Sequence, residues 1–93
     1  MAVRLIVTFP LLPGKAKAYA EAFSKVVEET RKEPGCEQYE LFASTSNPDK
    51  VVLLERWTSK ELLDQHMEVM KKRDMAALGA MRAGPPVAER FQV

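Results

Sequence analysis

The chain of 93 residues lacks the residues that several classes of protein need. Its one cysteine, Cys36, cannot form an internal disulfide, and with only one histidine, His66, it cannot supply the four ligands of a structural zinc site. The longest uncharged stretch, residues 5–14, contains two prolines and falls far short of the ~20 apolar residues that span a bilayer. The first nine residues also lack the pattern of a signal peptide. We therefore expect a cytoplasmic protein with no metal site and no membrane partner.

An excess of charge of one sign is also missing, because 14 lysines and arginines face 13 aspartates and glutamates for a net charge of +1. This balance gives no reason to expect a nucleic acid partner. The sequence contains no phosphate-binding glycine loop, dinucleotide-binding fingerprint or nucleophile elbow. With 46% hydrophobic and 29% charged residues, the chain is expected to form one globular domain over residues 1–93. Any catalysis would depend on the shape of a pocket, one histidine and the substrate's own reactivity, with no cofactor.

Hydrophobic periodicity predicts four strands and three helical segments. Alternating apolar residues place strands at residues 3–9, 36–46, 51–57 and 87–93. Apolar residues at helical spacing place helices at about residues 15–32, from an N-cap at Thr58 or Ser59 to Met70, and at about residues 74–81. The segment Asn47-Pro48-Asp49-Lys50 is typical of a turn and predicts a hairpin between the second and third strands.

The element order, βαββααβ, predicts an α+β fold of the ferredoxin-like, split βαβ type. Right-handed crossovers give an antiparallel four-stranded sheet in the order 4-1-3-2, with the helices on one face. The most apolar strands, at residues 3–9 and 51–57, then lie in the centre, and the run Val51-Val52-Leu53-Leu54 predicts a strand covered on both faces. The face without helices is too hydrophobic for a monomer of this size, which predicts a homodimer formed face to face or edge to edge.

His66 is the candidate base, because it is the only side chain whose ordinary pKa lies near neutrality. It shares one helix face with Leu62, Leu63, Met67 and Met70. Two interpretations are open. His66 is either a base in an apolar pocket or a structural histidine that bonds to a backbone carbonyl or a carboxylate.

Trp57, Glu55 and Leu53 project from one face of their strand, because side-chain direction alternates along a strand. If that face meets the helices, Glu55 and Trp57 can border one cavity with His66. The alternative for the tryptophan is an ordinary place in the core.

Tyr39 could offer its hydroxyl as a donor to the same cavity, or it could pack its ring and leave the hydroxyl in water. Cys36 has no basic neighbour in the sequence that would lower its pKa. It is expected to be a small buried residue rather than a nucleophile.

Several short segments occur in a characteristic order along the chain. They are Pro13-Gly14-Lys15, Glu33-Pro34-Gly35-Cys36, Tyr39-Glu40-Leu41, Asn47-Pro48-Asp49, Glu55-Arg56-Trp57 and His66. Together they resemble the antibiotic biosynthesis monooxygenase family over nearly the whole chain. The resemblance implies a ferredoxin-like fold that pairs into a dimeric α/β barrel.

Members of this family include cofactor-free oxygenases of polycyclic phenols and quinols, haem-degrading enzymes and an isomerase of a small phosphorylated carbonyl compound. Of the polar pocket of the polyketide oxygenases, this chain keeps the tryptophan, as Trp57. It has Leu53, Leu63 and about Ala77 in place of an asparagine, a tyrosine and an arginine. The residues that haem-degrading members use are absent. The chain is more similar to small members related to quinol monooxygenases, which commonly carry a histidine at the position of His66.

The resemblance implies a homodimeric, cofactor-independent monooxygenase that oxidises a small phenolic or hydroquinone substrate with O₂. His66 would assist removal of the substrate's hydroxyl proton, and Glu55 would orient His66. Trp57, Phe9 and Met70 would wall a dry cavity. Two alternatives are open: an isomerase or lyase that acts on a small carbonyl compound with His66 as base, or a non-catalytic dimeric ligand-binding module.

Overall fold

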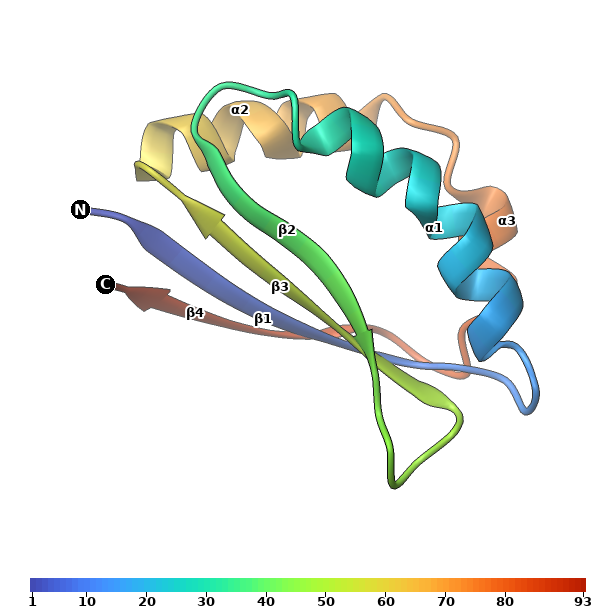
Figure 1. Cartoon of the computed structure of the whole chain (residues 1–93). Helices are drawn as coiled ribbons and strands as arrows, with labels where there is room; N and C mark the ends of the chain where they lie inside the picture. The colour runs from blue at the N-terminus through green and yellow to red at the C-terminus, as the bar shows by residue number, and fades with distance from the viewer.

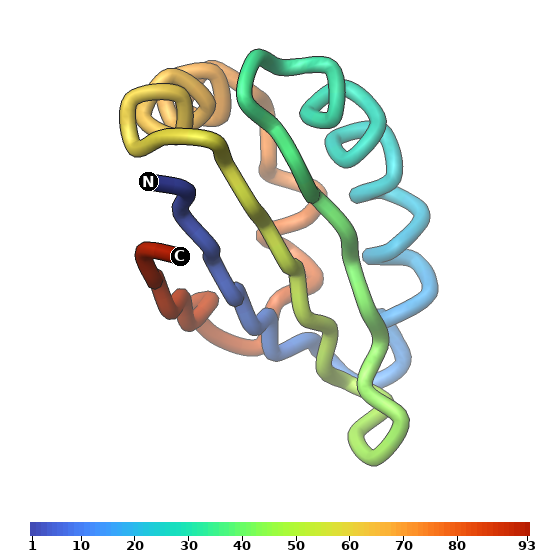
Figure 2. The backbone as a smooth tube through the Cα atoms, turned by 60° about the vertical axis from the view of Figure 1, so that its left-hand side comes forward, coloured from blue at the N-terminus to red at the C-terminus, as the bar shows by residue number.

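A computed structural model describes residues 1–93 as four strands and three helices in the order βαββααβ. The elements are β1 (Val3–Pro10), α1 (Ala16–Thr30), β2 (Cys36–Ala43), β3 (Lys50–Trp57), α2 (Lys60–Lys71), α3 (Ala76–Gly79) and β4 (Val87–Gln92). The strands form one antiparallel sheet in the order β2-β3-β1-β4, with all three helices on one face (Figures 1 and 2). The predicted ferredoxin-like topology and strand order are therefore confirmed.

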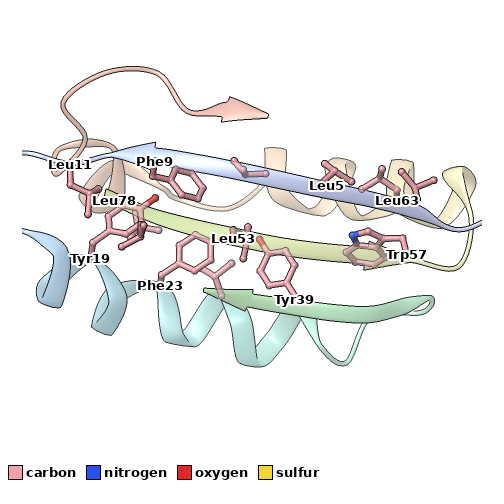
Figure 3. Packing of buried hydrophobic residues seen from close by; sticks show 14 residues of the cluster. Leu5, Phe9, Leu11, Tyr19, Phe23, Tyr39, Leu53, Trp57, Leu63 and Leu78 are labelled. Carbon is pink, nitrogen blue, oxygen red and sulfur yellow. The ribbon is translucent and has the colours of Figure 1, made fainter. Parts of the chain in front are cut away.

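The alternation in β1 and β3 produces the core. In both strands every second side chain is buried against the helices, beginning at Val3 in β1 and at Val51 in β3. Aromatic rings from three elements continue this core, with centroids 5.5 Å apart for Phe9 and Tyr19, 5.8 Å for Tyr19 and Phe23 and 6.1 Å for Phe23 and Tyr39 (Figure 3). The sheet therefore meets α1 through an aromatic layer rather than through aliphatic residues alone.

The loop between α1 and β2 passes close to the start of α2. Gly35 in this loop has φ 83°, and a Cβ there would lie 2.8 Å from the Leu62 Cβ on α2. Only glycine combines this conformation with such a close approach. On the other side of the contact, the Ser59 Oγ accepts a hydrogen bond from the Leu62 N–H at 3.2 Å, so Ser59 is the N-cap of α2.

Several predicted element ends differ from the observed ones. The second strand ends at Ala43 rather than Ser46, because the hairpin turn already begins at Ser44, whose Oγ accepts a hydrogen bond from the Asn47 N–H at 3.1 Å. The first helix is shorter than residues 15–32 by one residue at its start and two at its end. The last helical segment is one turn, Ala76–Gly79, rather than residues 74–81.

The face of the sheet that lacks helices is called the outer face. Strand pairing places on it the apolar residues Ile6, Phe42, Val52, Leu54, Val87 and Phe91. None of these side chains is fully buried, and Phe42 is 43% and Phe91 45% exposed. The prediction that β3 is covered on both faces is therefore wrong for the single chain, in which only the helix side is covered. None of the helices is both long enough and apolar enough to cross a membrane.

Candidate active site

A cavity of about 430 Å³ lies between the helix side of the sheet and α2, with α1 and the residues after α2 closing it. Two thirds of its 15 lining residues are hydrophobic. The volume lies within the usual range for sites that bind small organic molecules. The ionisable side chains that line it are Tyr39, Glu55, His66, Lys71 and Arg82.

The cavity brings together most of the residues predicted for the site. Phe9 from β1, Tyr39 from β2, Glu55 from β3 and His66 and Met70 from α2 all line it. Met67, which was expected on the inner face of α2, lies at the open side of the cavity and is 48% exposed.

Trp57 does not line the cavity as predicted, because it lies behind His66 and Glu55. Its side chain is fully buried, and its ring stacks on the imidazole of His66 with centroids 4.6 Å apart. The indole Nε1–H donates a hydrogen bond to Glu55 Oε1 at 3.0 Å. Trp57 therefore supports two residues of the cavity wall from behind.

His66 lies between two carboxyl groups. Its Nδ1 is 3.0 Å from Glu33 Oε1, and its Nε2 is 3.9 Å from Glu55 Oε1. Glu55 was expected to orient His66, but the 3.9 Å separation is too long for a hydrogen bond. Glu33, in the loop after α1, makes the orienting bond instead.

The protonation of His66 follows from its surroundings. Burial lowers its pKa from the ordinary value of 6.5, and this effect outweighs the opposing hydrogen bond and charge of Glu33. The imidazole is therefore neutral at pH 7. Glu33 Oε1 lies at hydrogen-bond distance from Nδ1 and accepts its hydrogen bond, which places the proton of the neutral ring on Nδ1 and leaves the lone pair on Nε2.

Glu55 has the opposite tendency. Burial raises the pKa of Glu55 above its usual range, the nearby Glu33 raises it further, and the hydrogen bond from Trp57 opposes both. The carboxyl group is thus held toward its protonated form, beside a neutral imidazole. His66 and Glu55 thus lie together in one apolar cavity, where burial lowers the pKa of the imidazole and raises the pKa of the carboxyl.

Tyr39 and Cys36 are not activated. The Tyr39 ring meets His66 edge-on, with centroids 5.4 Å apart, and burial raises the pKa of its phenol well above the usual value. Tyr39 does not leave its hydroxyl in water, because the residue is only 2% exposed. Cys36 is half-buried, and burial with the charges of Glu33 and Glu55 raises the pKa of its thiol, which disfavours the thiolate.

Two polar residues of the site were missed from the sequence. Glu33 was given no role of its own, although it lies in one of the segments that carried the family resemblance. Arg82 follows α3 and carried no signal in the sequence. No group of three or more His, Cys, Asp or Glu side chains is arranged to hold a metal ion.

Comparisons with known proteins agree with this architecture. The family model for antibiotic biosynthesis monooxygenases matches residues 2–82. A conserved protein of Methanosarcina mazei Go1 superimposes with a TM-score of 0.89 at 25% identity, over 99% of this chain and 92% of that chain. A Caulobacter crescentus CB15 protein, provisionally assigned as an antibiotic biosynthesis monooxygenase, gives 0.85 at 26% identity, over 99% and 89% of the two chains. A comparison with curated proteins found no match.

Proposed function

The chain belongs to the antibiotic biosynthesis monooxygenase family, and from this premise we propose that it oxidises a small phenol or hydroquinone with O₂ without a cofactor. The observation that carries the proposal is the neutral His66, held by Glu33 and facing Glu55 at 3.9 Å in an apolar cavity. Family membership supports a monooxygenase-like or related activity. The substrate class and the roles of the residues are our inference from the site.

The first step is removal of a proton from the substrate. A substrate hydroxyl within hydrogen-bond reach of both Nε2 of His66 and the carboxyl of Glu55 can donate its proton to Nε2. The Glu55 carboxyl, whose pKa burial raises, can donate a hydrogen bond to the same oxygen when it carries its proton. The imidazolium that forms is stabilised by Glu33 at Nδ1. The catalytic residue is therefore His66, and Glu33 acts as a positioning residue.

The phenolate then reacts with O₂ directly. It transfers one electron to O₂, and the substrate radical and superoxide combine into a peroxide at a ring carbon. The peroxide takes up a proton from protonated His66 and becomes a hydroperoxide. The ring carbon that carries it then loses its hydrogen as a proton to His66, and the electrons of that C–H bond form a carbonyl as the O–O bond breaks. The hydroxide that leaves takes up this proton from His66 and becomes water. A hydroquinone with O₂ thus gives a hydroxyquinone and water, with one oxygen atom in each product. The apolar lining keeps bulk water away from the radical pair.

We also propose that the protein functions as a homodimer joined through the outer face. Members of the family are typically dimers that bind small molecules. The apolar side chains of the outer face, centred on Ile6 and Leu54, are covered by nothing in the single chain. Leu54→Asp is expected to give monomers in analytical ultracentrifugation, with Lys17→Gln, at an exposed position on α1, as a control. A wild-type monomer would contradict this proposal.

Oxygen uptake tests the proposed activity. Protein treated with a chelator is offered hydroquinones, naphthols and hydroxylated anthrones, and its oxygen consumption is compared with the spontaneous rate. We expect enzyme-dependent uptake that falls at least about 100-fold in His66→Gln and is unchanged in Lys17→Gln, since general-base catalysis typically contributes 10²–10⁴-fold. No uptake above the spontaneous rate across the panel would favour the isomerase or ligand-binding alternatives. Uptake that His66→Gln retains would refute the assigned base.

A further inference from the structure

Arg82 lies at the end of the cavity opposite the base. At one end, Glu55 lies opposite Leu5 of β1 in the sheet. At the other end, the guanidinium carbon of Arg82 lies 4.9 Å from the ring centroid of Phe9, also on β1. Leu5 and Phe9 are four residues apart, or about 13 Å along the strand. The cavity therefore has an acid–base group at one end, a cation at the other and apolar walls between them.

Arg82 is held in place but not neutralised. Its Nε and Nη2 donate hydrogen bonds to the Tyr19 hydroxyl at 3.1 and 3.0 Å, and burial raises the pKa of Tyr19, which keeps the phenol neutral. Arg82 makes no ion pair, in contrast to Arg56 with Glu37 and Arg73 with Glu29. Three of its five N–H donors have no acceptor in the chain.

These features point to an anionic group on the ligand. A guanidinium presents paired donors that match a carboxylate, and an ion pair of this kind is stronger in an apolar cavity than in water. Tyr19 and Phe9 already fix the plane of the guanidinium, so a ligand need not order it. Lys71, the other cation of the lining, is 2.9 Å from Glu68 and is largely exposed.

We propose that Arg82 binds a carboxylate at the far end of the substrate, so that the preferred substrate is a fused-ring hydroxyaromatic acid with its hydroxyl at His66. The position of the hydroxyl rests on the proposed function, but the carboxylate site does not. Tyr19 acts on Arg82 as a positioning residue.

Binding of two small aromatic probes tests this site. 2-Naphthoate carries the carboxylate and no hydroxyl, and 2-naphthamide is its uncharged analogue of nearly the same shape. Dissociation constants are measured by calorimetry at pH 7 for the full chain, for Arg82→Gln and for Tyr19→Phe. Lys17→Gln removes one exposed positive charge on α1 and controls for net charge.

The wild-type protein is expected to bind the naphthoate at least about tenfold more tightly than the amide, since a hydrogen bond to a charged group is worth more than a neutral one. Arg82→Gln should lose this preference, Tyr19→Phe should reduce it, and Lys17→Gln should keep it. Equal wild-type affinity for the two probes, or no binding of either, overturns the proposal without any variant. If Arg82→Gln still prefers the naphthoate, the proposal is also overturned, because the preference for the charged probe then does not depend on Arg82.

Oxidation of 6-hydroxy-2-naphthoate separates the two proposals. If naphthoate is preferred but neither its hydroxylated form nor any compound of the panel drives oxygen uptake, the carboxylate site stands and the proposed oxygenase activity fails. If neutral hydroquinones are oxidised but the naphthoate is not preferred, the oxygenase activity stands and the assignment of Arg82 fails.

Discussion

Replacing Glu33 with glutamine tests how the site holds its base. In the wild-type protein the Glu33 Oε1 lies 3.0 Å from His66 Nδ1, and the Glu33 side chain is only 16% exposed, so solvent screens the contact weakly. A glutamine keeps the size of the side chain and can still accept through its amide oxygen. What it removes is the negative charge that stabilises an imidazolium.

The size of the effect follows from the strength of the bond. A hydrogen bond to a charged group contributes about 1.5–3 kcal/mol, against about 1 kcal/mol for a neutral one. The loss of about 1–2 kcal/mol from the charged intermediate corresponds to a decrease of about 5- to 30-fold in kcat. KM should change little, because Glu33 does not line the cavity.

The pH dependence gives a second readout that a purely structural role would not produce. Glu33 raises the pKa of His66 against the larger effect of burial, so its removal lowers that pKa further. Because the reaction needs neutral His66, the acidic limb of the kcat profile should move to lower pH in Glu33→Gln. Glu28→Gln, at an exposed position of α1 that makes no ion pair, serves as the control. An unchanged kcat, or an acidic limb that moves to higher pH, would refute the role of Glu33.

Three further substitutions test the surroundings of the base. Burial raises the pKa of Glu55, so ionisation of this carboxyl opposes folding, and the wild-type protein loses stability as the pH rises above 4.5, the ordinary pKa of a glutamate. Glu55→Gln should therefore be more stable than the wild-type protein in urea unfolding at pH 7. Equal stability of the two proteins at all pH values would contradict this prediction. Trp57→Phe removes the hydrogen bond to Glu55 and part of a buried ring, so it should lower the free energy of unfolding by about 1–3 kcal/mol in the same assay, while His66 still acts as the base. A loss of kcat as large as that of a His66 variant would contradict the supporting role of Trp57. Gly35→Ala should lower both the melting temperature and the activity, because residue 35 has a φ of 83° and a Cβ there would clash with Leu62. An unchanged melting temperature would show that the loop is not constrained at this position.

The sequence was informative about the fold because its strongest patterns are local. Alternating apolar residues placed the first strand at residues 3–9, close to the observed Val3–Pro10. Apolar residues at helical spacing placed the first helix at residues 15–32, close to the observed Ala16–Thr30. Strand order followed from the handedness of crossovers. Element ends were less predictable, since the end of β2 depends on the Ser44 hydroxyl bonding to the turn rather than on hydrophobicity.

The site was predicted only in part, because its geometry depends on contacts between distant residues. His66 and Glu55 could be placed near one another from the periodicity of a helix and a strand. Glu33 reaches His66 across 33 positions, through a loop whose path depends on the close approach of Gly35 to Leu62. Nothing in the local pattern of residues 81–83 indicates that Arg82 enters the cavity.

Isotopically labelled oxygen shows whether the site transfers one atom of O₂ to a phenolic substrate. The chelator-treated protein is incubated under ¹⁸O₂ with the most reactive compound of the panel, and product and water are analysed by mass spectrometry. We expect one ¹⁸O atom in each product molecule and the other in water, with His66→Gln reduced to the spontaneous level. A product without ¹⁸O, formed at the same rate in the absence of oxygen, would contradict this expectation.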